Sequence, residues 1–469
     1  MLGPDILYLP VSELARRIES RKISPVELTE SYLARSEKLG PKLNAYATLT
    51  ADLALQQARK AESEIKAGHY RGRLHGIPYA AKDLLAVKGY PTSWGAKPFA
   101  DRKFDYNAAI IGNLNRAGAV LLGKAAMIEL AGGMGYRFAS ASISAAAKNP
   151  WNQDCWTCGS SSGSGAIVAA ALAPFAIGTE TWGSIICPAA FCGVTGLRPT
   201  FGRVSRYGAM ALAYSMDKIG PLARTAEDCA MVLAVISGHD PQDRGTLTLD
   251  QATFINSPSQ DLSTKSLRFG WLANAWNNVE PSLAKAVDEA MRVVRKYAGK
   301  VAGAKLPEGP FDEAANVIVA VEGASAFESL IESGRCADLT DPLGKIAGYV
   351  NQQISGTDYL HALRVRGILQ KKMAELYETF DVLIAPSQPL AATPLDFDLE
   401  KGLSFADPQG AIGNLCGLPA ISVPCGFTDK KLPVGLQFMA RAGNDRAVVA
   451  AARAFQQHTN WHLRRPQIS

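Results

Sequence analysis

The feature that most constrains the fold is a change of pattern at about residue 74. From there, short apolar runs rich in β-forming residues alternate with glycine- and serine-rich turns and with alanine-rich helical stretches. Examples of these runs are IPYAA, AVLLG and VTGL, followed later by DVLIAPSQPL and PAISVPCGF. Such alternation is typical of strands in a sheet that is covered by helices. The pattern therefore predicts an α/β fold.

The chain before residue 74 predicts helices instead. SPVELTESYLARSEKL begins with Ser24 as the N-cap and Pro25 in the first helical position, and Glu27 completes a capping box. A more polar helix, ADLALQQARKAESEIKAG, follows and stops at Gly68. Near the other end of the chain, RAVVAAARAFQQHT has the apolar spacing of an amphipathic helix.

The chain shows no internal repeat and no long linker, so we expect one large domain over residues 1–469. This length can bury a sizeable core. The pattern divides the domain into N-terminal helices at 1–70, a core at 71–230, a helical excursion at 245–380 and a return to the sheet at 381–469.

Composition excludes several classes of partner. Hydrophobic residues make up 47% of the chain and charged residues 20%, which is typical of a globular protein. The net charge is only +6, and Lys and Arg are scattered without forming a stripe, so neither a nucleic acid nor a membrane surface is expected as a partner. The most apolar stretch, AIVAAALAPFAIG, is 13 residues long and contains Pro174, which makes it too short for a membrane span.

The start of the chain and the cysteines indicate a cytoplasmic location. MLGPDILYLP lacks the basic segment and apolar core of a signal peptide. In a chain of this length without such a signal, we expect the eight cysteines to be mostly reduced, buried small hydrophobes. They are Cys155, Cys158, Cys187, Cys192, Cys229, Cys336, Cys416 and Cys425.

Three segments match the residue pattern of a known functional motif, but the residues around them do not fit that motif. GSSSG, with Ser161 in the middle, has the form of a nucleophile elbow, but that motif follows a strand, and NPWNQDCWTC before it is a poor strand. GAVLLGKA has the spacing of a P-loop, but its interior is apolar and Ala125 replaces the residue that holds magnesium. Cys155 and Cys158 spell C-x-x-C without a second pair at zinc spacing.

The histidines form no ligand pattern either. None of the six belongs to an H-E-x-x-H motif or to another metal-binding arrangement, so no metal and no other cofactor is expected. They are His69, His75, His239, His361, His458 and His462.

Three further segments carry residues suited to nucleophilic catalysis. They are GIPYAAKD with Lys82, CGSSSGSG with Ser160, and GTETWGSI with Ser184. Apolar residues flank Lys82, and desolvation lowers the pKa of a lysine, so that its neutral amine can accept a proton. Each segment alone also fits a simpler interpretation, as a surface lysine, a loop, or an N-cap for the alanine-rich helix at about 165–172. The N-terminus of such a helix also suits a developing anion.

Together, these segments resemble the amidase signature family of serine hydrolases. That family has a lysine in a G-I-P-x-x-x-K-D stretch, a GGSSGGS-like loop, and a nucleophile 24 residues downstream in a G-T-D/E-x-x-G-S-I element. Lys82 with Asp83, Ser160 and Ser184 stand at the matching positions, with the same offset. CGVTGLRPTFGRVSRYGAM, MDKIGPLARTAEDCA and NLCGLPAISVPCGF continue the similarity, which runs from about residue 10 to 466.

The resemblance implies a Ser–cisSer–Lys triad. Ser184 would attack the carbonyl carbon, Ser160 would follow a non-proline cis peptide bond and relay the proton, and neutral Lys82 would be the final base. No histidine is then needed. The resemblance also implies a large, mixed, mostly parallel twisted sheet with helices on both faces. It further implies an oxyanion hole made of the backbone N–H groups of Thr181, Trp182, Gly183 and Ser184.

Several departures from the family pattern bear on the substrate. Trp182 replaces a glycine, and its indole either walls an apolar pocket near the acyl site or packs beneath the loop. Ile186 stands where several relatives carry arginine, so a clamp for a substrate carboxylate is missing there. In GGMGYRF, Met134 and Tyr136 occupy the segment that lines the pocket in relatives, with core packing as the alternative. Cys158 replaces the first glycine of the serine loop.

The resemblance and its departures predict an amidase that hydrolyses a neutral, fairly apolar amide through an acyl-enzyme on Ser184. Carbamates (urethanes) and esters undergo the same tetrahedral chemistry. We expect a small-molecule substrate and a monomer or homodimer. The alternative is the A subunit of a glutamyl-tRNA amidotransferase, a glutaminase that works in a complex; Ile186 and GGMGYRF argue against it. A catalytically inactive relative is a third possibility, which the intact triad opposes.

Overall fold

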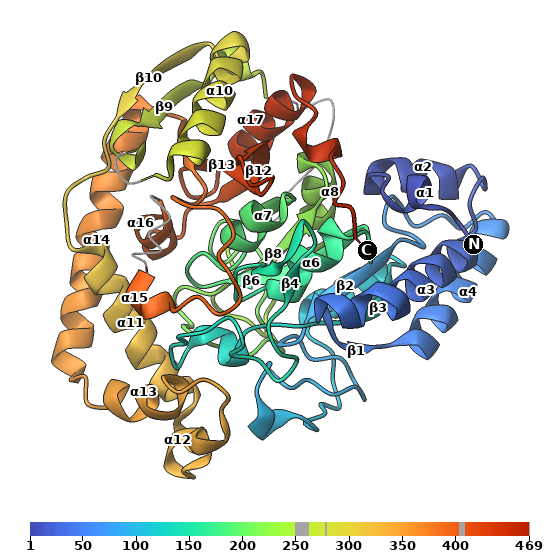
Figure 1. The fold of residues 1–469 in the computed structure, drawn as a ribbon, viewed down its shortest axis with the longest axis horizontal. Helices are drawn as coiled ribbons and strands as arrows, with labels where there is room; N and C mark the ends of the chain where they lie inside the picture. Colours follow the sequence, from blue (N-terminus) through green and yellow to red (C-terminus); the bar gives the residue numbers. More distant parts are fainter. Residues whose placement is uncertain (249–261, 277–278, 403–408, 469) are drawn as a thin grey trace.

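The computed structural model describes residues 1–248, 262–276, 279–402 and 409–468, which fold around one large sheet (Figure 1). The sheet has eleven strands in the order β1-β3-β2-β6-β8-β7-β12-β13-β11-β9-β10. In chain order they are β1 (Tyr46–Leu49), β2 (Pro78–Lys82), β3 (Val120–Ala125), β6 (Phe175–Glu180), β7 (Thr195–Arg198), β8 (Lys218–Ala223), β9 (Arg268–Leu272), β10 (Lys300–Ala304), β11 (Val382–Pro386), β12 (Ala420–Phe427) and β13 (Pro433–Ala440). The five apolar runs singled out in the sequence all form strands, namely β2, β3, β7, β11 and β12.

The sheet is mixed, as expected for the α/β class. Parallel pairs lie toward its two ends, where β2 pairs with β3 and β6, and β9 pairs with β11 and β10. The pairs from β6 across to β11 are antiparallel, as is β1 with β3. Among the ten pairings of the described strands, four are therefore parallel and six antiparallel, so the mixed sheet has fewer parallel pairs than the family resemblance implies.

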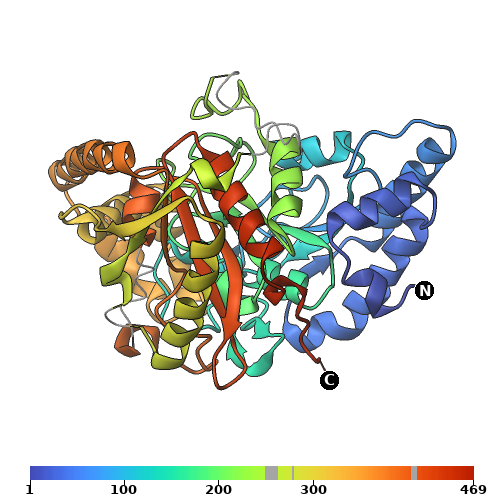
Figure 2. The ribbon, with the colours of Figure 1, turned by 90° about the horizontal axis from the view of Figure 1, so that it is seen from above.

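Helices cover the two faces of the sheet (Figure 2). Gly435 of β13 faces Ala190 of α7, whereas Phe438, three residues further along, packs against Phe455 of α17. Because strand side chains alternate between faces, α7 and α17 lie on opposite sides. Helix α6 packs against α7, while α8 and α10 pack against α17. These helices are α6 (Ser162–Ala169), α7 (Ile186–Cys192), α8 (Ala226–Ile236), α10 (Pro281–Tyr297) and α17 (Asp445–Gln457).

The N-terminal helices pack at the β1 end of the sheet (Figure 1). They are α1 (Pro4–Leu7), α2 (Val11–Glu19), α3 (Pro25–Leu43) and α4 (Ala51–Lys66), and α5 (Ala109–Arg116) follows later in the chain. Ser24 caps α3 as expected, because its hydroxyl accepts hydrogen bonds from the N–H groups of Val26 and Glu27. The sequence did not predict β1, which lies between α3 and α4 and whose four residues are all half-buried.

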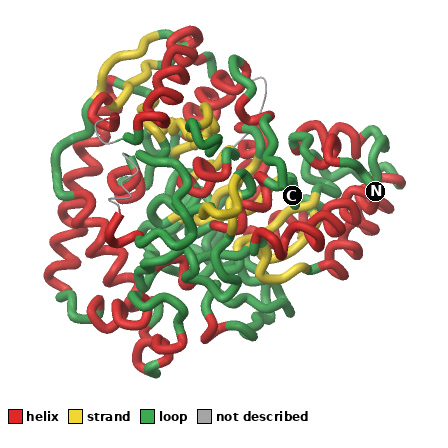
Figure 3. Tube along the Cα trace, in the orientation of Figure 1, coloured by secondary structure: helices red, strands yellow, loops and turns green. Residues whose placement is uncertain are grey.

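The segment expected to be a helical excursion is largely helical, with residues 249–261 and 277–278 outside the described part (Figure 3). It also contributes β9 and β10, which extend the sheet at its far end. Its helices after α10 are α11 (Phe311–Ala326), α12 (Glu328–Glu332), α13 (Gly344–Asn351) and α14 (Gly356–Thr379). Two short helices, α15 (Leu399–Gly402) and α16 (Gly410–Leu415), follow before the chain returns to the sheet.

The reason for setting aside GSSSG as a nucleophile elbow, that no strand precedes it, was wrong. Residues 152–156 of NPWNQDCWTC do form a strand, β5 (Asn152–Trp156), which pairs with β4 (Lys148–Asn149) in a separate two-stranded sheet. The sequence did not reveal β5 because its first three residues are polar, and only its last two residues are buried. GAVLLGKA, in contrast, forms the fully buried strand β3 as expected.

The cysteines differ from expectation at one pair. Six are free and buried, as predicted, but Cys158 and Cys187 form a disulfide with an S–S distance of 2.07 Å. These two residues are 29 positions apart, so no short spacing motif marks them as partners. The packing of α6 against α7 brings their segments together.

Candidate active site

Lys82 occupies the last position of β2, in the interior of the sheet. Its side chain is completely buried, and its Nζ lies 2.7 Å from Ser160 Oγ and 2.9 Å from Thr179 Oγ1. Thr179 belongs to β6, the strand next to β2. The sheet thus places a lysine amine directly against one of the two serines identified in the sequence.

Ser160 lies on the loop between β5 and α6. The Gly159–Ser160 peptide bond is cis, as the resemblance implies. The Ser160 carbonyl accepts a hydrogen bond from the Ile128 N–H at 3.2 Å. The hydroxyl of the next residue, Ser161, donates a hydrogen bond to the Thr179 carbonyl and accepts one from the Thr179 N–H. Ser161 therefore anchors the loop to β6. Ser161 is therefore a structural residue rather than the centre of a nucleophile elbow.

Ser184 lies on the short turn between β6 and α7. Gly183 has φ +82°, a left-handed conformation that glycine adopts without steric cost. The Ser184 side chain is mostly buried, with 8% of the residue exposed. Within the described part of the chain, no hydrogen bond joins the Ser160 and Ser184 hydroxyls, so the direct contact of the proposed relay lies between Ser160 and Lys82.

A buried carboxylate holds the Ser184 turn in place. Glu180 Oε2 accepts the backbone N–H groups of Ile185 at 2.8 Å and Ile186 at 3.0 Å. Its other oxygen accepts from Arg198 at 2.7 Å and from Asn414 at 3.0 Å. Burial alone would raise the pKa of Glu180, but Arg198 and these hydrogen bonds lower it to about 2. Glu180 therefore remains ionised and ties the residues after Ser184 to the centre of the sheet.

The environment of Lys82 favours a neutral amine. Burial lowers the pKa of Lys82 to about 7, although the negative charges of Asp217 and Glu180 act in the opposite direction. An amine with this pKa is half deprotonated near neutral pH and can accept a proton from a hydroxyl at hydrogen-bond distance. The complete burial of Lys82 agrees with the desolvation expected from its apolar flanks.

The turn also presents unused hydrogen-bond donors. Among the described residues, the backbone N–H groups of Trp182, Gly183 and Ser184 have no acceptor. Thr181 is fixed at the start of the turn, since its hydroxyl donates to Asp217 Oδ1 at 2.5 Å. Converging free N–H groups can stabilise the oxyanion of a tetrahedral intermediate. Trp182, Gly183 and Ser184 are three of the four residues for which the family resemblance implies this role, and the fourth is Thr181.

The residues expected in a substrate pocket divide into two groups. Ile186 is completely buried and Met134 nearly so, and neither presents a surface to solvent in this structure. Trp182 and Tyr136 are half-buried. Trp182 packs on the same apolar cluster as Ile186, while Tyr136 packs edge-on against Trp156. Half-burial leaves Trp182 and Tyr136 as the candidate substrate contacts.

Sequence reasoning missed two residues that organise the site. Thr179 contacts both Lys82 and Ser161, and Asp217 accepts bonds from Thr181 and from the Leu212 and Ala213 N–H groups. Both stand inside stretches already recognised as family-like, GTETWGSI and MDKIGPLARTAEDCA. That position was the only available signal, because their partners come from other strands and loops.

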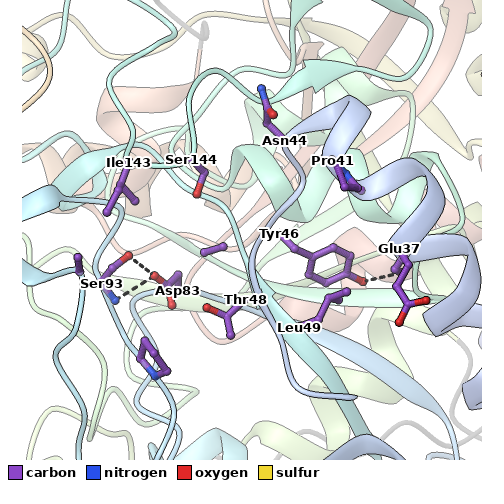
Figure 4. A pocket seen from close by; sticks show the side chains of 15 residues that line it. Glu37, Pro41, Asn44, Tyr46, Thr48, Leu49, Asp83, Ser93, Ile143 and Ser144 are labelled. Atoms are coloured by element: carbon purple, nitrogen blue, oxygen red, sulfur yellow. Dashed lines mark hydrogen bonds between the residues drawn. The ribbon is translucent and has the colours of Figure 1, made fainter. Parts of the chain in front are cut away.

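Two cavities adjoin the site. Thr179, Thr181 and Asp217 help to line one of about 160 Å³. A larger one, of about 540 Å³, lies beside Asp83 and is bordered by α3 and β1 (Figure 4). Asp83 accepts two hydrogen bonds from Ser93 and pairs with the buried Lys124 at 2.9 Å, so it braces the chain just after Lys82. Among the described residues, no group of three or more His, Cys, Asp or Glu side chains is arranged to hold a metal ion.

Comparison with known families decides the kind of protein. The sequence model of the Amidase family matches residues 27–449. The chain belongs to this family. Amidase-family proteins act on C–N amide bonds, so this chain is an enzyme of that class. The match covers every residue of the candidate triad.

Relatives within the amidase family differ in the activities that their names state. The chain is 36% identical, over 98% of its length and 99% of the relative's, to the A subunit of the glutamyl-tRNA(Gln) amidotransferase of Pseudomonas syringae pv. tomato. The structure resembles native peptide amidase from Stenotrophomonas maltophilia, with a TM-score of 0.85, 30% identity, and 96% and 97% of the two chains covered. It also resembles 6-aminohexanoate cyclic dimer hydrolase complexed with substrate, with a TM-score of 0.85, 26% identity, and 98% and 99% covered. None of the described helices is long and apolar enough to cross a membrane.

Proposed function

We propose that this chain hydrolyses an amide C–N bond through an acyl-enzyme on Ser184. The observation that supports the proposal most directly is the 2.7 Å contact between Ser160 Oγ and the buried amine of Lys82. In the proposed reaction, Ser184 Oγ attacks the carbonyl carbon and passes its proton to Ser160, which passes its own proton to neutral Lys82. The proton then returns to the leaving amine, and water hydrolyses the acyl ester.

Charge develops on the carbonyl oxygen during the attack, and the turn is suited to receive it. The free N–H groups of Trp182, Gly183 and Ser184 would donate to this oxyanion. Glu180 fixes the other end of the turn through the next two N–H groups. Because these donors belong to the backbone, replacing a family glycine by Trp182 leaves the oxyanion hole intact.

Two classes of substrate are candidates for this site, and each is favoured by a different observation. Two residues favour a neutral, fairly apolar amide, carbamate or ester. Ile186 places a buried apolar side chain where several relatives carry arginine, and Trp182 packs against the same apolar cluster. Glutamine, hydrolysed by one component of an amidotransferase complex, fits the names of the curated relatives. The sequence comparisons favour the second class more than the first. We keep the neutral amide as the interpretation of the site itself.

A substrate panel with the purified chain separates these classes. If the site takes neutral amides, kcat/KM for an apolar aryl or primary amide should exceed that for glutamine by about 10²-fold or more, since an apolar pocket rejects an added polar group by about that factor. Release of amine, ammonia or p-nitrophenol is measured, with Ser184→Ala as the blank. Ammonia release from glutamine that exceeds turnover of the neutral amides would establish the glutaminase instead.

The dependence of activity on pH tests the role of Lys82. Since only the neutral amine accepts a proton and its pKa is about 7, kcat/KM should rise as pH increases toward that value and level off above it. Below the pKa the rise should be about tenfold per pH unit, as expected for one essential base. Initial rates over neutral and flanking pH, at constant ionic strength, give the profile. A rate that falls as pH rises through 7 would contradict the assignment.

A further inference from the structure

The Cys158–Cys187 disulfide joins the two segments that carry the serines. Cys158 comes two residues before Ser160, and Cys187 comes three residues after Ser184. The disulfide therefore links the loop that carries Ser160 to the first turn of α7, the helix that follows Ser184. No other disulfide occurs among the described residues.

The backbone at Cys158 indicates that a cysteine is present there for its sulfur. Cys158 has φ +63°, the left-handed conformation that favours glycine, and it replaces the first glycine of the serine loop. A side chain at such a position is disfavoured and persists only when its surroundings hold it. The bond to Cys187 fixes the position of its side chain. An unusual backbone conformation at a functional loop is a reason to look for a function of that side chain.

Hydrogen bonds from the β4–β5 hairpin act at the opposite end of α7. Asn149 donates to the Phe191 carbonyl at 2.8 Å, and Trp151 donates to the Cys192 carbonyl at 2.8 Å. Both bonds fix the last residues of the helix to the β4–β5 hairpin. The disulfide alone covalently links the end of α7 nearest Ser184 to the Ser160 loop.

We propose that the Cys158–Cys187 disulfide is a redox-responsive modification site that sets the relative position of Ser160 and Ser184. The inference rests on the proposed function of these serines. In a reducing compartment such bonds are typically transient, catalytic or redox-sensing. The reductant is a dithiol. One of its thiolates attacks a protein sulfur, breaks the S–S bond and forms a mixed disulfide, and its second thiol displaces the remaining protein thiol. The products are two protein thiols and the oxidised dithiol.

The test compares the full-length enzyme in its oxidised and dithiothreitol-reduced forms. Reduction should lower kcat by about tenfold or more, because small displacements of reacting groups cost up to about a hundredfold in rate. KM should change less, and reoxidation should restore kcat. Both sulfurs belong to residues with 5% or less exposed, so reduction is followed to completion by mass spectrometry of alkylated peptides. The double variant Cys158→Ser/Cys187→Ser should match the reduced wild type and ignore dithiothreitol.

Matched controls distinguish this inference from the proposed function. Cys155→Ser and Cys192→Ser remove free buried thiols from the neighbouring segments and should keep the response to dithiothreitol. If oxidised wild type shows no more turnover than Ser184→Ala, the proposed function is contradicted, irrespective of the state of the cysteines. If oxidised wild type is active but the reduced enzyme, still folded by circular dichroism, keeps its full kcat, the inference is overturned. Peptide mapping that finds both thiols free before reduction overturns it as well.

Discussion

Replacing Ser184 by alanine should lower kcat for amide hydrolysis by at least about 10⁴-fold, because loss of a serine nucleophile removes the covalent route entirely. The variant should also resist labelling by a serine-directed sulfonyl fluoride. Ser184 makes no side-chain hydrogen bond to another described residue, so its loss should leave the fold intact. Turnover is measured with the best substrate of the panel, and labelling by intact-protein mass.

Ser161→Ala is the matched control for this experiment. Ser161 is also buried and stands at the centre of GSSSG, but its hydroxyl bonds to Thr179 instead of facing the Ser184 turn. The Ser161 variant should still carry the sulfonyl adduct on Ser184, even if the weakened loop lowers its rate. An adduct that persists in Ser184→Ala and disappears in Ser161→Ala would exchange the roles of the two serines.

The candidate triad could be proposed from the sequence because its signal is local. Lys82, Ser160 and Ser184 each stand in a short stretch with a recognisable order of glycines and apolar residues, and the offset of 24 residues links the two serines. The structure places Lys82 and Ser160 in contact. Several strands of the sheet were predictable for a similar reason, because β2, β3 and β12 are nearly continuous runs of apolar residues.

The parts that the sequence did not reveal depend on contacts between distant segments. Thr181 follows β6 and Asp217 precedes β8, so the pairing of these two strands brings them together. Cys158 and Cys187 meet because α6 packs against α7. Such pairings leave no periodic trace in the chain. β1 was missed because its four half-buried residues are too few for an alternation to be seen, and the polar residues of β5 conceal a strand.

Lys82→Ala should lower kcat/KM for amides by about 10²- to 10⁴-fold, the usual contribution of a general base. Its amine is the only side-chain nitrogen among the described residues that bonds to Ser160. The residual activity should lose the ionisation near pH 7, because that ionisation belongs to the deleted group. The measurement is a pH profile of kcat/KM for wild type and variant, with folding checked by circular dichroism.

The variant Lys82→Arg distinguishes a lysine that accepts a proton from one that only supplies positive charge beside Ser160. Arginine carries a permanent positive charge and several donors for Ser160 and Thr179, on a side chain one atom longer than that of lysine, but it does not deprotonate in proteins. If Lys82 acts by accepting a proton, the arginine variant should be as inactive as the alanine variant. If the lysine served only to hold Ser160 by hydrogen bonding or charge, arginine should restore much of the rate. Restored activity in Lys82→Arg would therefore rule out general-base catalysis by this residue while leaving Ser184 as the nucleophile.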